Sequence, residues 1–259
     1  MGSRLQAGLQ HLVEPQRWLC SQFDRLFAAE LRVDGNSTFR RSLVWWHVRP
    51  GMLVYDVGGG KRPFFSPEQK SNLKLRVCGV DISQAELDAA PAGSYDTALC
   101  ADITSFKGSS DADLVICRAV LEHVPDTDRA LGAIASILRP GGKALLFVPC
   151  RNAFFARLNL LLPHQFKRNV LFALLPETQA AHGFRSYYHR CTPADFRAMS
   201  AGLGLAVEEL KTYSMSAYFS LFFPMYLLWR SWTLMARRLG WEQACETFSV
   251  VLRKPVALS

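Results

Sequence analysis

The sequence predicts an α/β protein with a mostly parallel sheet of seven strands, helices on both faces and a helical segment before the sheet. Three observations predict this fold. The chain has 259 residues, of which 49% are hydrophobic, enough for a substantial core. Short apolar runs of strand type alternate with polar or helical stretches, at residues 52–57, 75–80, 96–101, 113–117 and 143–148. Two later runs, Ala206–Tyr213 and Glu246–Arg253, have the pattern of a closing pair of strands.

Two helices are expected in the N-terminal segment, residues 1–50, where they pack on the core. After Pro15, apolar residues follow helical spacing until Asp34 and Gly35 break the pattern. Residues 36–38 (Asn-Ser-Thr) then offer an N-cap for a second helix through Trp46.

Residues 51–259 are expected to form the main domain. Its clearest helix runs from Thr127 to Leu138, where the sequence Pro140-Gly141-Gly142 stops it. Two apolar insertions interrupt the later part of the domain, at residues 151–181 and 213–243.

The positive charge of the chain is confined to its later part. Residues 1–140 contain 16 basic and 16 acidic residues, whereas residues 141–259 contain 14 and 6, which accounts for the whole formal charge of +8. Such an excess favours nucleic acid, an anionic membrane or an acidic substrate. Nucleic acid is excluded here, because the aromatic residues stand in contiguous apolar runs and do not alternate with Lys and Arg.

The seven cysteines are scattered singly, without a CxxC pair, and four of them end or occupy apolar runs. This pattern indicates buried thiols in a reducing compartment. Near the N-terminus, Gln10, His11, Glu14 and Gln16 interrupt any apolar core of a signal peptide. We therefore expect a cytoplasmic protein, and no spacing of Asp, His or Cys predicts a metal site.

The strongest local signal is an apolar strand that runs directly into three glycines, Leu53 to Gly60. Glycines at such a point let the backbone turn sharply and let a ligand lie against bare main chain. From Gly58 the pattern is G-x-G-x-x-P, without the third glycine of dinucleotide sites, and Asp56 precedes the first glycine by two residues. Both details count against a nicotinamide cofactor.

Carboxylates follow at the ends of the next two strands. Asp81 lies 25 residues after Asp56, the usual place for an acid that accepts hydrogen bonds from ribose hydroxyls. Asp102 and Ile103 repeat the arrangement with a carboxylate and an apolar residue, which suit an adenine amino group and its flat face. The fourth strand ends at Arg118 and leads into the segment Leu121-Glu122-His123-Val124.

These motifs together resemble the class I S-adenosylmethionine-dependent methyltransferases, of the methyltransferase type 11-like group. The likeness covers about residues 50–150 and rests on five motifs in the correct order, the last being Leu138 to Gly142. It implies a Rossmann-like fold and S-adenosylmethionine as cofactor. The residues that it implies for cofactor binding are Asp56, Gly58, Gly59, Gly60, Asp81, Ile82, Asp102, Ile103 and Arg118.

One departure from the family pattern concerns the first helix of the sheet domain. Lys61-Arg62-Pro63 replaces the third loop glycine, and only about 14 residues, including Pro63 and Pro67, separate Gly60 from the next strand. We therefore expect this helix to be short or displaced.

Methyl transfer from a sulfonium is an in-line displacement, so the protein chiefly aligns the reactants and excludes water. If the acceptor is a hydroxyl, a histidine is the natural base. The candidates are His123, in the segment that the resemblance puts beside the methyl group, and His189. Replacing either by alanine is expected to lower turnover more than cofactor affinity. Donors around His189 are the candidate acceptor-binding residues: His182, Arg185, Tyr187 and Tyr188.

The second insertion contains 18 residues without a charge, from Thr212 to Trp229, followed by Arg230, Arg237 and Arg238. This length is at the lower limit of a membrane span, but the strands on either side return to one sheet, which argues against spanning. A break at Pro224 would permit a helical hairpin or a helix in the membrane plane. The alternative is a hydrophobic lid over the acceptor site.

The sequence thus favours a cytoplasmic methyltransferase at the membrane face that methylates, preferably at oxygen, an amphipathic or lipid-linked acceptor. Two alternatives stay open. One is a methyltransferase that acts on a dissolved sugar or natural product under the lid. The other is a cofactor-binding regulator or assembly subunit without catalysis, which the altered loop at Arg62 and Pro63 allows.

Overall fold

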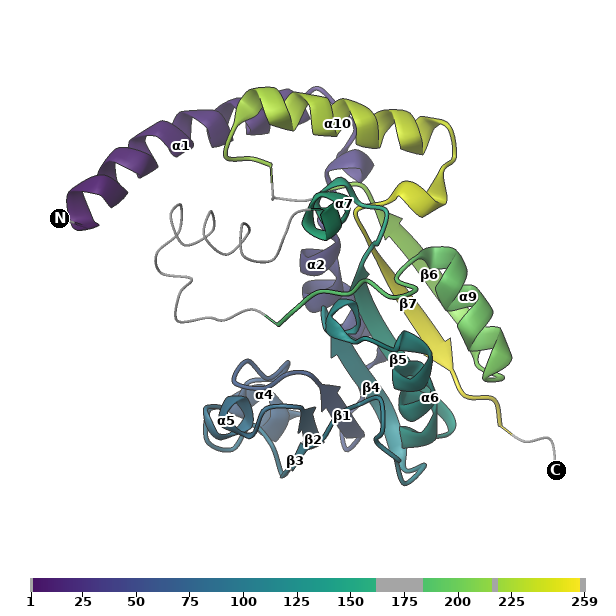
Figure 1. Cartoon of the computed structure of the whole chain (residues 1–259). Helices are drawn as coiled ribbons and strands as arrows, with labels where there is room; N and C mark the ends of the chain where they lie inside the picture. Colours follow the sequence, from purple (N-terminus) through teal and green to yellow (C-terminus); the bar gives the residue numbers. More distant parts are fainter. Residues whose placement is uncertain (1, 162–183, 216–218, 257–259) are drawn as a thin grey trace.

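The computed structural model describes residues 2–161, 184–215 and 219–256, with side chains from residue 13 onward. Within this part of the chain a single sheet has the strand order β3-β2-β1-β4-β5-β7-β6 (Figure 1). The strands are β1 (Leu53–Val57), β2 (Arg76–Asp81), β3 (Thr97–Cys100), β4 (Ala112–Arg118), β5 (Leu138–Pro149), β6 (Ala206–Tyr213) and β7 (Thr247–Arg253). The first five pair in parallel, and β7 runs antiparallel to both β5 and β6. The predicted α/β fold with a mostly parallel seven-stranded sheet is confirmed.

Alternate residues of the strands enter two separate cores, because successive side chains of a strand point to opposite faces. On one face, Val115 and Leu146 pack against α6 (Thr127–Ile137) and α9 (Pro193–Gly202). On the other face, Leu114 and Leu145 belong to the core that also contains Phe39 and Val44. Helical segments therefore cover both faces of the sheet.

The segment that covers the second face differs in detail from the prediction. Asp34, not residues 36–38, is its N-cap and accepts a hydrogen bond from the Ser37 N–H. The chain then continues without a break through α2 (Gly35–Thr38), a π-turn (Phe39–Leu43) and α3 (Val44–His47). The aspartate carboxylate satisfies a free N–H of the first turn better than a neutral side chain at this end of a helix.

Helix α1 (Gly2–Asp24) also differs, because it begins before Pro15 and contains that proline. A short 3-10 helix, η1 (Ala29–Arg32), follows it. α1 packs against α10 (Phe223–Arg238), and the two helices cross one end of the sheet side by side (Figure 1). Pro224 stands in the first turn of α10, where a missing N–H costs nothing. Of the two arrangements expected there, a hairpin or a single helix, the chain forms a single helix.

The predicted helix from Thr127 is present as α6, but β5 already begins at Leu138 and includes Pro140, Gly141 and Gly142. The register of β5 against β4 is irregular at this point, since Leu138 pairs with Ala112 and Lys143 with Leu114. The turn residues thus form a bulge inside the strand rather than a loop before it.

The remaining helices of the described part are short. They are α4 (Pro67–Asn72), α5 (Gln84–Asp88), α7 (Phe154–Leu161) and the 3-10 turns η3 (Leu121–His123) and η5 (Glu242–Ala244). α4 has only six residues and begins seven residues after Gly60, with Ser66 and Gln69 as a capping box. The expectation of a short first helix is confirmed. Of the first insertion, residues 162–181 lie outside the described residues.

Candidate functional site

A cavity of about 430 Å³ opens where the parallel strands β1, β2, β3 and β4 end. The carboxyl ends of parallel strands are the usual place for a ligand in an open α/β sheet. Its lining comes from four strand ends and from the segment after residue 183: Val57, Gly58, Val80, Asp81, Ile82, Ala101, Asp102, Ile103, Ala119, Val120, His123, Val124, Pro125, Phe184, Arg185 and Tyr187.

The glycine loop after β1 is shaped so that a ligand can approach its main chain. Gly58 has a φ of +73°, and a Cβ there would lie 2.2 Å from the Cγ2 of Val120. Its N–H donates to the Val80 carbonyl at 2.7 Å. Gly59 and Gly60 complete the turn, because their carbonyls accept hydrogen bonds from the Arg62 N–H and the Tyr95 hydroxyl. Only Gly58 of the three lines the cavity.

Asp56, a predicted cofactor residue, does not line the cavity, and its carboxylate holds this loop in shape. Its side chain is buried, and Oδ2 accepts hydrogen bonds from the Phe64 N–H at 2.7 Å and from the Tyr95 hydroxyl. These bonds close the stretch after Gly60, where a longer helix would otherwise begin. Burial raises the pKa of the Asp56 carboxyl to about 6, although the Phe64 N–H and nearby Arg118 oppose the shift.

The predicted ribose and adenine residues do come together. Asp81, Ile82, Asp102 and Ile103 all line the cavity. The Oδ1 atoms of both aspartates accept local backbone N–H groups, from Ser83 at 2.9 Å and Thr104 at 2.8 Å, which hold each carboxylate in place. Burial raises the pKa of Asp81. The side chain of Ile82 is 59% exposed at the cavity rim, so it can be covered by a ligand.

Arg118 stands beside the cavity without lining it, and it joins the N-terminal segment to the sheet. Its guanidinium donates to Oδ1 of Asn36 in α2, at 3.1 Å. Burial lowers the pKa of Arg118, and repulsion from Arg40 and Arg62 adds to this effect. Arg40 and Arg62 thus place two further cations near Arg118, and such a group suits an anionic part of a ligand, such as a carboxylate.

His123 lines the cavity, as predicted, and two contacts orient its ring. Nδ1 lies 3.2 Å from the Arg185 carbonyl oxygen and 3.2 Å from the Ser186 hydroxyl. Burial lowers the pKa of the imidazole, so the ring is neutral near pH 7. A carbonyl only accepts, and therefore Nδ1 carries the proton of the neutral ring and Nε2 is its basic atom.

His189, the second predicted base, does not line this cavity. Its Nδ1 accepts a hydrogen bond from the Thr127 N–H at the start of α6. Asp126 and Asp128 lie close enough to it that the three could hold a metal ion. Each is already engaged, however, since Arg190 pairs with Asp128 and the Arg129 N–H donates to Asp126. We assign this cluster to the capping of α6.

The four candidate acceptor residues separate into three groups. Arg185 and Tyr187 line the cavity, with the guanidinium 5.1 Å from the ring centroid. Tyr188 is buried in the core that also contains residues of α6, and it is not part of the lining. His182 lies outside the described residues.

The main-chain carbonyl of Glu122 holds this segment over the cavity. It accepts hydrogen bonds from the Tyr187 N–H at 2.7 Å and the Tyr188 N–H at 3.0 Å. The sequence did not predict these hydrogen bonds to the Glu122 carbonyl, and it did not predict roles for Tyr95 and Phe184 at the site. Tyr95 follows a loop and has no local signal, whereas Phe184 stood within the donor-rich segment and could have been found there.

The Glu122 side chain is buried, and burial raises its pKa to about 8. Its Oε1 lies 3.8 Å from Nε2 of His123, and its Oε2 has no hydrogen-bond partner among the described residues. A carboxyl in such a place is protonated near neutral pH. Asp56 and Glu246 are buried carboxyls with pKa values raised to about 6 and about 7.

Glu122→Gln is expected to become more stable relative to the natural protein as pH rises. The folded state holds a proton on Glu122 that the unfolded state releases above its ordinary pKa of 4.5. The stabilisation is therefore complete below that pKa and is lost as pH rises through about 8, at up to about 1.4 kcal/mol per pH unit. Urea unfolding of both proteins from about pH 5 to about pH 9 gives the difference curve. A difference in the free energy of unfolding that does not change with pH would contradict the argument from burial of Glu122. Titration of Asp56 and Glu246 does not affect this difference, because both proteins contain these residues.

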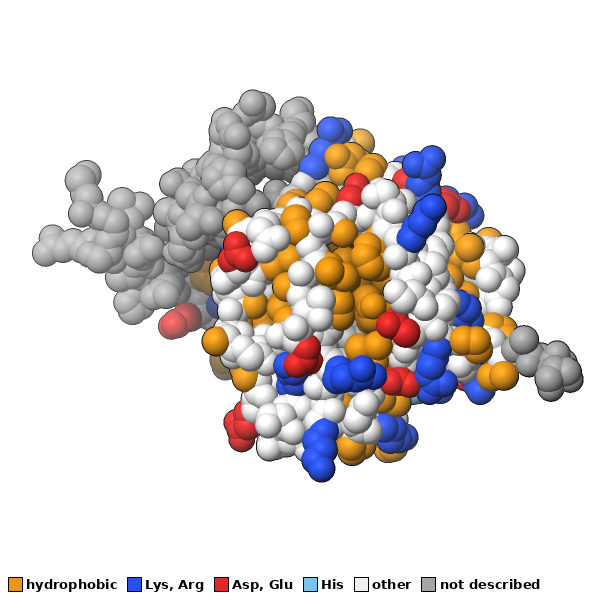
Figure 2. Space-filling model, turned by 90° about the horizontal axis from the view of Figure 1, so that it is seen from below, with side chains coloured by type: hydrophobic (Ala, Val, Ile, Leu, Met, Phe, Trp, Pro, Cys, Tyr) orange, Lys and Arg blue, Asp and Glu red, His pale blue; other side chains and the backbone are white. Residues whose placement is uncertain are grey.

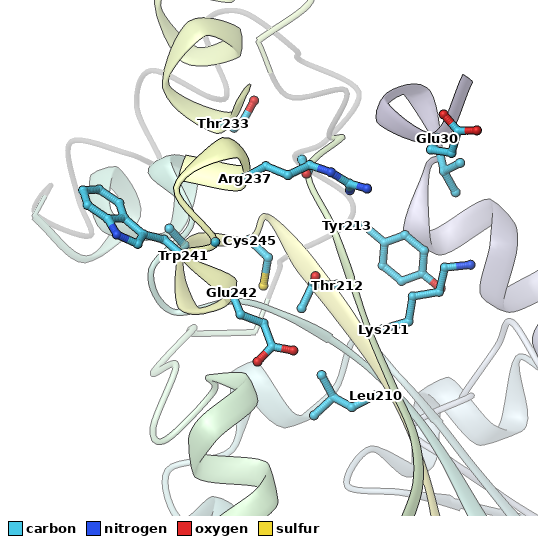
Figure 3. Close-up of a pocket in the computed structure, with 14 residues that line it drawn as sticks. Glu30, Leu210, Lys211, Thr212, Tyr213, Thr233, Arg237, Trp241, Glu242 and Cys245 are labelled. Carbon is cyan, nitrogen blue, oxygen red and sulfur yellow. The ribbon is translucent and has the colours of Figure 1, made fainter. Parts of the chain in front are cut away.

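A larger cavity, of about 520 Å³, lies elsewhere, between β6, the end of α10 and η5 (Figure 3). It contains none of the strand-end residues described above. In Figure 3 the Arg237 side chain extends from α10 toward the side where Lys211 and Tyr213 lie. We regard the smaller cavity as the reaction site, because the glycine loop, the carboxylates and His123 converge only there.

The smaller cavity fits the cofactor that the motifs imply. Gly58 lines the cavity without a side chain, Asp81 and Asp102 offer carboxylates, and Ile103 offers an apolar surface. These groups match a main-chain approach, ribose hydroxyls, an adenine amino group and an adenine face.

Comparison with known proteins places the chain among methyltransferases. A family model described as a methyltransferase domain matches residues 17–208. A ubiquinone biosynthesis O-methyltransferase of Cupriavidus pinatubonensis is 26% identical over 62% of this chain, and one of Coxiella burnetii is 31% identical over the same share. The matched regions cover 63% and 66% of those relatives, so the chain spans less than two thirds of their length.

Solved structures support the fold. A phosphoethanolamine N-methyltransferase of Haemonchus contortus, in complex with S-adenosyl-L-methionine, has a TM-score of 0.52 and 16% identity. The match covers 92% of this chain and 57% of that one. An S-adenosylmethionine-dependent methyltransferase of Mesorhizobium loti has a TM-score of 0.50 and 16% identity, over 79% of this chain and 91% of that one.

Proposed function

The chain belongs to the methyltransferase-domain family, whose cofactor is S-adenosylmethionine, and from this premise we propose that it methylates an oxygen of an amphipathic acceptor at a membrane surface. The observation that carries the proposal is the composition of the single cavity of about 430 Å³. It combines the predicted cofactor residues Gly58, Asp81 and Asp102 with His123 and with the aromatic side chains of Phe184 and Tyr187.

When bound, S-adenosylmethionine supplies an electrophilic methyl group on a sulfonium. The residues of this chain then have to hold the acceptor in line, exclude water and remove the hydroxyl proton. Phe184 and Tyr187 supply an apolar wall that limits water near the reacting oxygen. The Glu122 carbonyl holds this wall in place through the Tyr187 N–H.

His123 serves as the base. Its neutral ring keeps Nδ1–H on the Arg185 carbonyl, so Nε2 accepts the proton that leaves the acceptor hydroxyl as its oxygen gains the methyl group. The imidazolium that results lies 3.8 Å from Oε1 of Glu122. Its excess proton can pass to solvent, because the side chain of His123 is partly exposed.

Two observations support an acceptor with an apolar tail. The relatives from Cupriavidus pinatubonensis and Coxiella burnetii are named as ubiquinone biosynthesis O-methyltransferases, and we extend that class of acceptor, a hydroxylated quinone precursor, to this chain. In addition, α10 leaves large apolar side chains exposed, including Leu228. A dissolved sugar would need neither feature.

The proposal is tested first by cofactor binding. Gly58→Ala is expected to lower the affinity for S-adenosylmethionine about 10- to 100-fold, because the added Cβ would overlap Val120 in the cavity wall. Isothermal titration calorimetry measures the effect. The matched control is Gly51→Ala, at a φ of +82° with no atom within 4 Å of the new Cβ. It should lose about 1 kcal/mol of stability and keep its affinity.

The second arm is an assay with a hydroxylated aromatic acceptor that bears a short isoprenoid tail. Methylation at oxygen is the expected product, identified by mass spectrometry. Binding of the cofactor without transfer to any hydroxyl acceptor would favour a cofactor-binding regulator, and no cofactor binding by the natural protein would overturn the proposal.

A further inference from the structure

Helix α10 is apolar on two sides, because Tyr226 and Trp229 are buried against the protein while a second row of large apolar residues faces solvent. Its buried positions include Arg230 and Thr233. Its exposed apolar residues recur every three or four positions and therefore form one stripe: Phe222, Met225, Leu228, Trp232, Met235 and Leu239. Their exposed fractions run from 38% for Trp232 to 71% for Leu228.

The inward face of α10 is fixed by a buried ion pair, so the helix cannot turn its stripe inward. The Arg230 Nε donates to Asp24 at 3.0 Å, and the guanidinium also donates to the carbonyls of Ser214 and Leu31. Tyr226 donates to the same aspartate. Rotating α10 would break all of these contacts. The exposed stripe is therefore a lasting feature of the surface, which needs an apolar partner.

The charge around the stripe is positive. Helix α10 contains no acidic residue, and it ends with the exposed Arg237 and Arg238. Arg237 and Lys211 line the cavity below the end of the helix (Figure 3), and neither has an ion-pair partner within the described part of the chain. Of the two acids in this cavity, Glu242 is paired with Arg197, which leaves Glu30.

The face of the molecule away from α10 has a different distribution of charged and apolar side chains. Figure 2, seen from below, shows apolar side chains in the middle of that face with blue and red side chains interspersed around them. Mixed signs of charge give no preference for an anionic surface. The combination of an apolar ridge with unpaired cations belongs to the α10 side, and it is complementary to anionic lipid.

The position of α10 also relates it to the reaction site. η5 connects α10 to β7, and the first residue of β7, Thr247, pairs with Pro149 at the carboxyl end of β5. α10 therefore lies at the same edge of the sheet as the cavity with Gly58 and His123. No helix among the described residues is both long and apolar enough to cross a bilayer.

We propose that α10 lies in the plane of an anionic membrane, with its apolar stripe at the boundary of headgroups and acyl chains and with Arg237 and Arg238 on lipid phosphates. The stripe from Phe222 to Leu239 is about 25 Å long at 1.5 Å per residue, a length suited to lying along the surface. Trp232 and Trp241, with ring centroids 6.0 Å apart, suit the headgroup level. This inference rests on the proposed function, since docking through α10 brings the end of the sheet that carries the cavity close to an acceptor whose tail lies in the membrane.

Vesicle flotation tests the inference with the full chain. The natural protein should float with vesicles of phosphatidylcholine plus phosphatidylglycerol and much less with phosphatidylcholine alone. Leu228→Asp with Met235→Asp should lower the bound fraction about tenfold. Arg237→Gln with Arg238→Gln should weaken binding to the anionic vesicles and reduce its salt dependence. The matched control is Trp46→Asp, an apolar residue 75% exposed on α3, which should float normally.

Two readouts keep the outcomes distinct. Unchanged affinity for S-adenosylmethionine shows that each variant is folded. If the natural protein fails to float at low salt, or if the α10 double variant floats normally, the inference is overturned. It is also overturned if sedimentation shows a dimer that the α10 variant dissociates while neither protein binds vesicles, because the stripe then contacts a second copy. Continued methylation of a short-tailed acceptor in any of these cases leaves the proposed O-methylation standing and overturns only its place at a membrane surface.

Discussion

Replacing His123 by alanine is expected to lower kcat about 100-fold or more while the affinity for S-adenosylmethionine changes only a few-fold. The ring lines the cavity, and its Nδ1 is held by the Arg185 carbonyl, so removing it deletes the proton acceptor but none of the glycine-loop or carboxylate contacts. Steady-state kinetics with the tailed acceptor, together with calorimetry of the cofactor, separate the two quantities.

His189→Ala is the matched control, because that histidine accepts from the Thr127 N–H outside the cavity. It should change kcat little and cost some stability at the start of α6. A pH profile adds a second readout. The natural enzyme should lose activity as His123 is protonated below its lowered pKa, and this limb should disappear in His123→Ala. Equal kcat values for His123→Ala and the natural protein would contradict the role of His123.

Arg230→Ala is expected to cost about 3–5 kcal/mol in the free energy of unfolding. The side chain is fully buried and holds the carboxylate of Asp24 as well as the carbonyls of Ser214 and Leu31. Truncation leaves a buried charge and two carbonyls without their donor. Urea unfolding measures the loss.

The double variant Asp24→Asn with Arg230→Met should be less destabilised than Arg230→Ala alone, because it removes both charges and restores apolar volume. Lys61→Ala removes a partner of the surface pair with Glu86 and should cost less than about 1 kcal/mol. A loss for Arg230→Ala as small as that of Lys61→Ala would mean that the buried pair does not hold α1 to α10.

The sequence was sufficient for features that depend on neighbours along the chain. Strand ends were predicted within a few residues because their apolar runs are short and bounded, and Asp81 and Asp102 were located because parallel strands end at one edge. The short helix α4 could be predicted in the same way, since Pro63 and Pro67 restrict where a helix can begin.

Features that depend on distant partners could not be predicted. In the sequence Arg230 follows the uncharged run 212–229 and was interpreted as its basic flank. In the folded chain Arg230 is buried in an ion pair with Asp24. The hydrogen bond to Asp56 from Tyr95, which is 39 residues away in sequence, could not be predicted either, and it gives Asp56 a part in holding the glycine loop. His123, the first candidate by position, and His189 were both predicted as bases, and only the folded chain separates the one at the cavity from the one at the start of α6.

The ion pair between Asp24 and Arg230 also affects the order in which the chain can fold. The two residues are 206 positions apart, so the contact closes a loop that includes every strand of the sheet except β7. Synthesis delivers α1 first and its partner helix only after β6 has left the ribosome. Until then the inner face of α1 has no binding surface, and the sheet has to assemble without it. The packing of α1 against α10 is therefore a late event in folding.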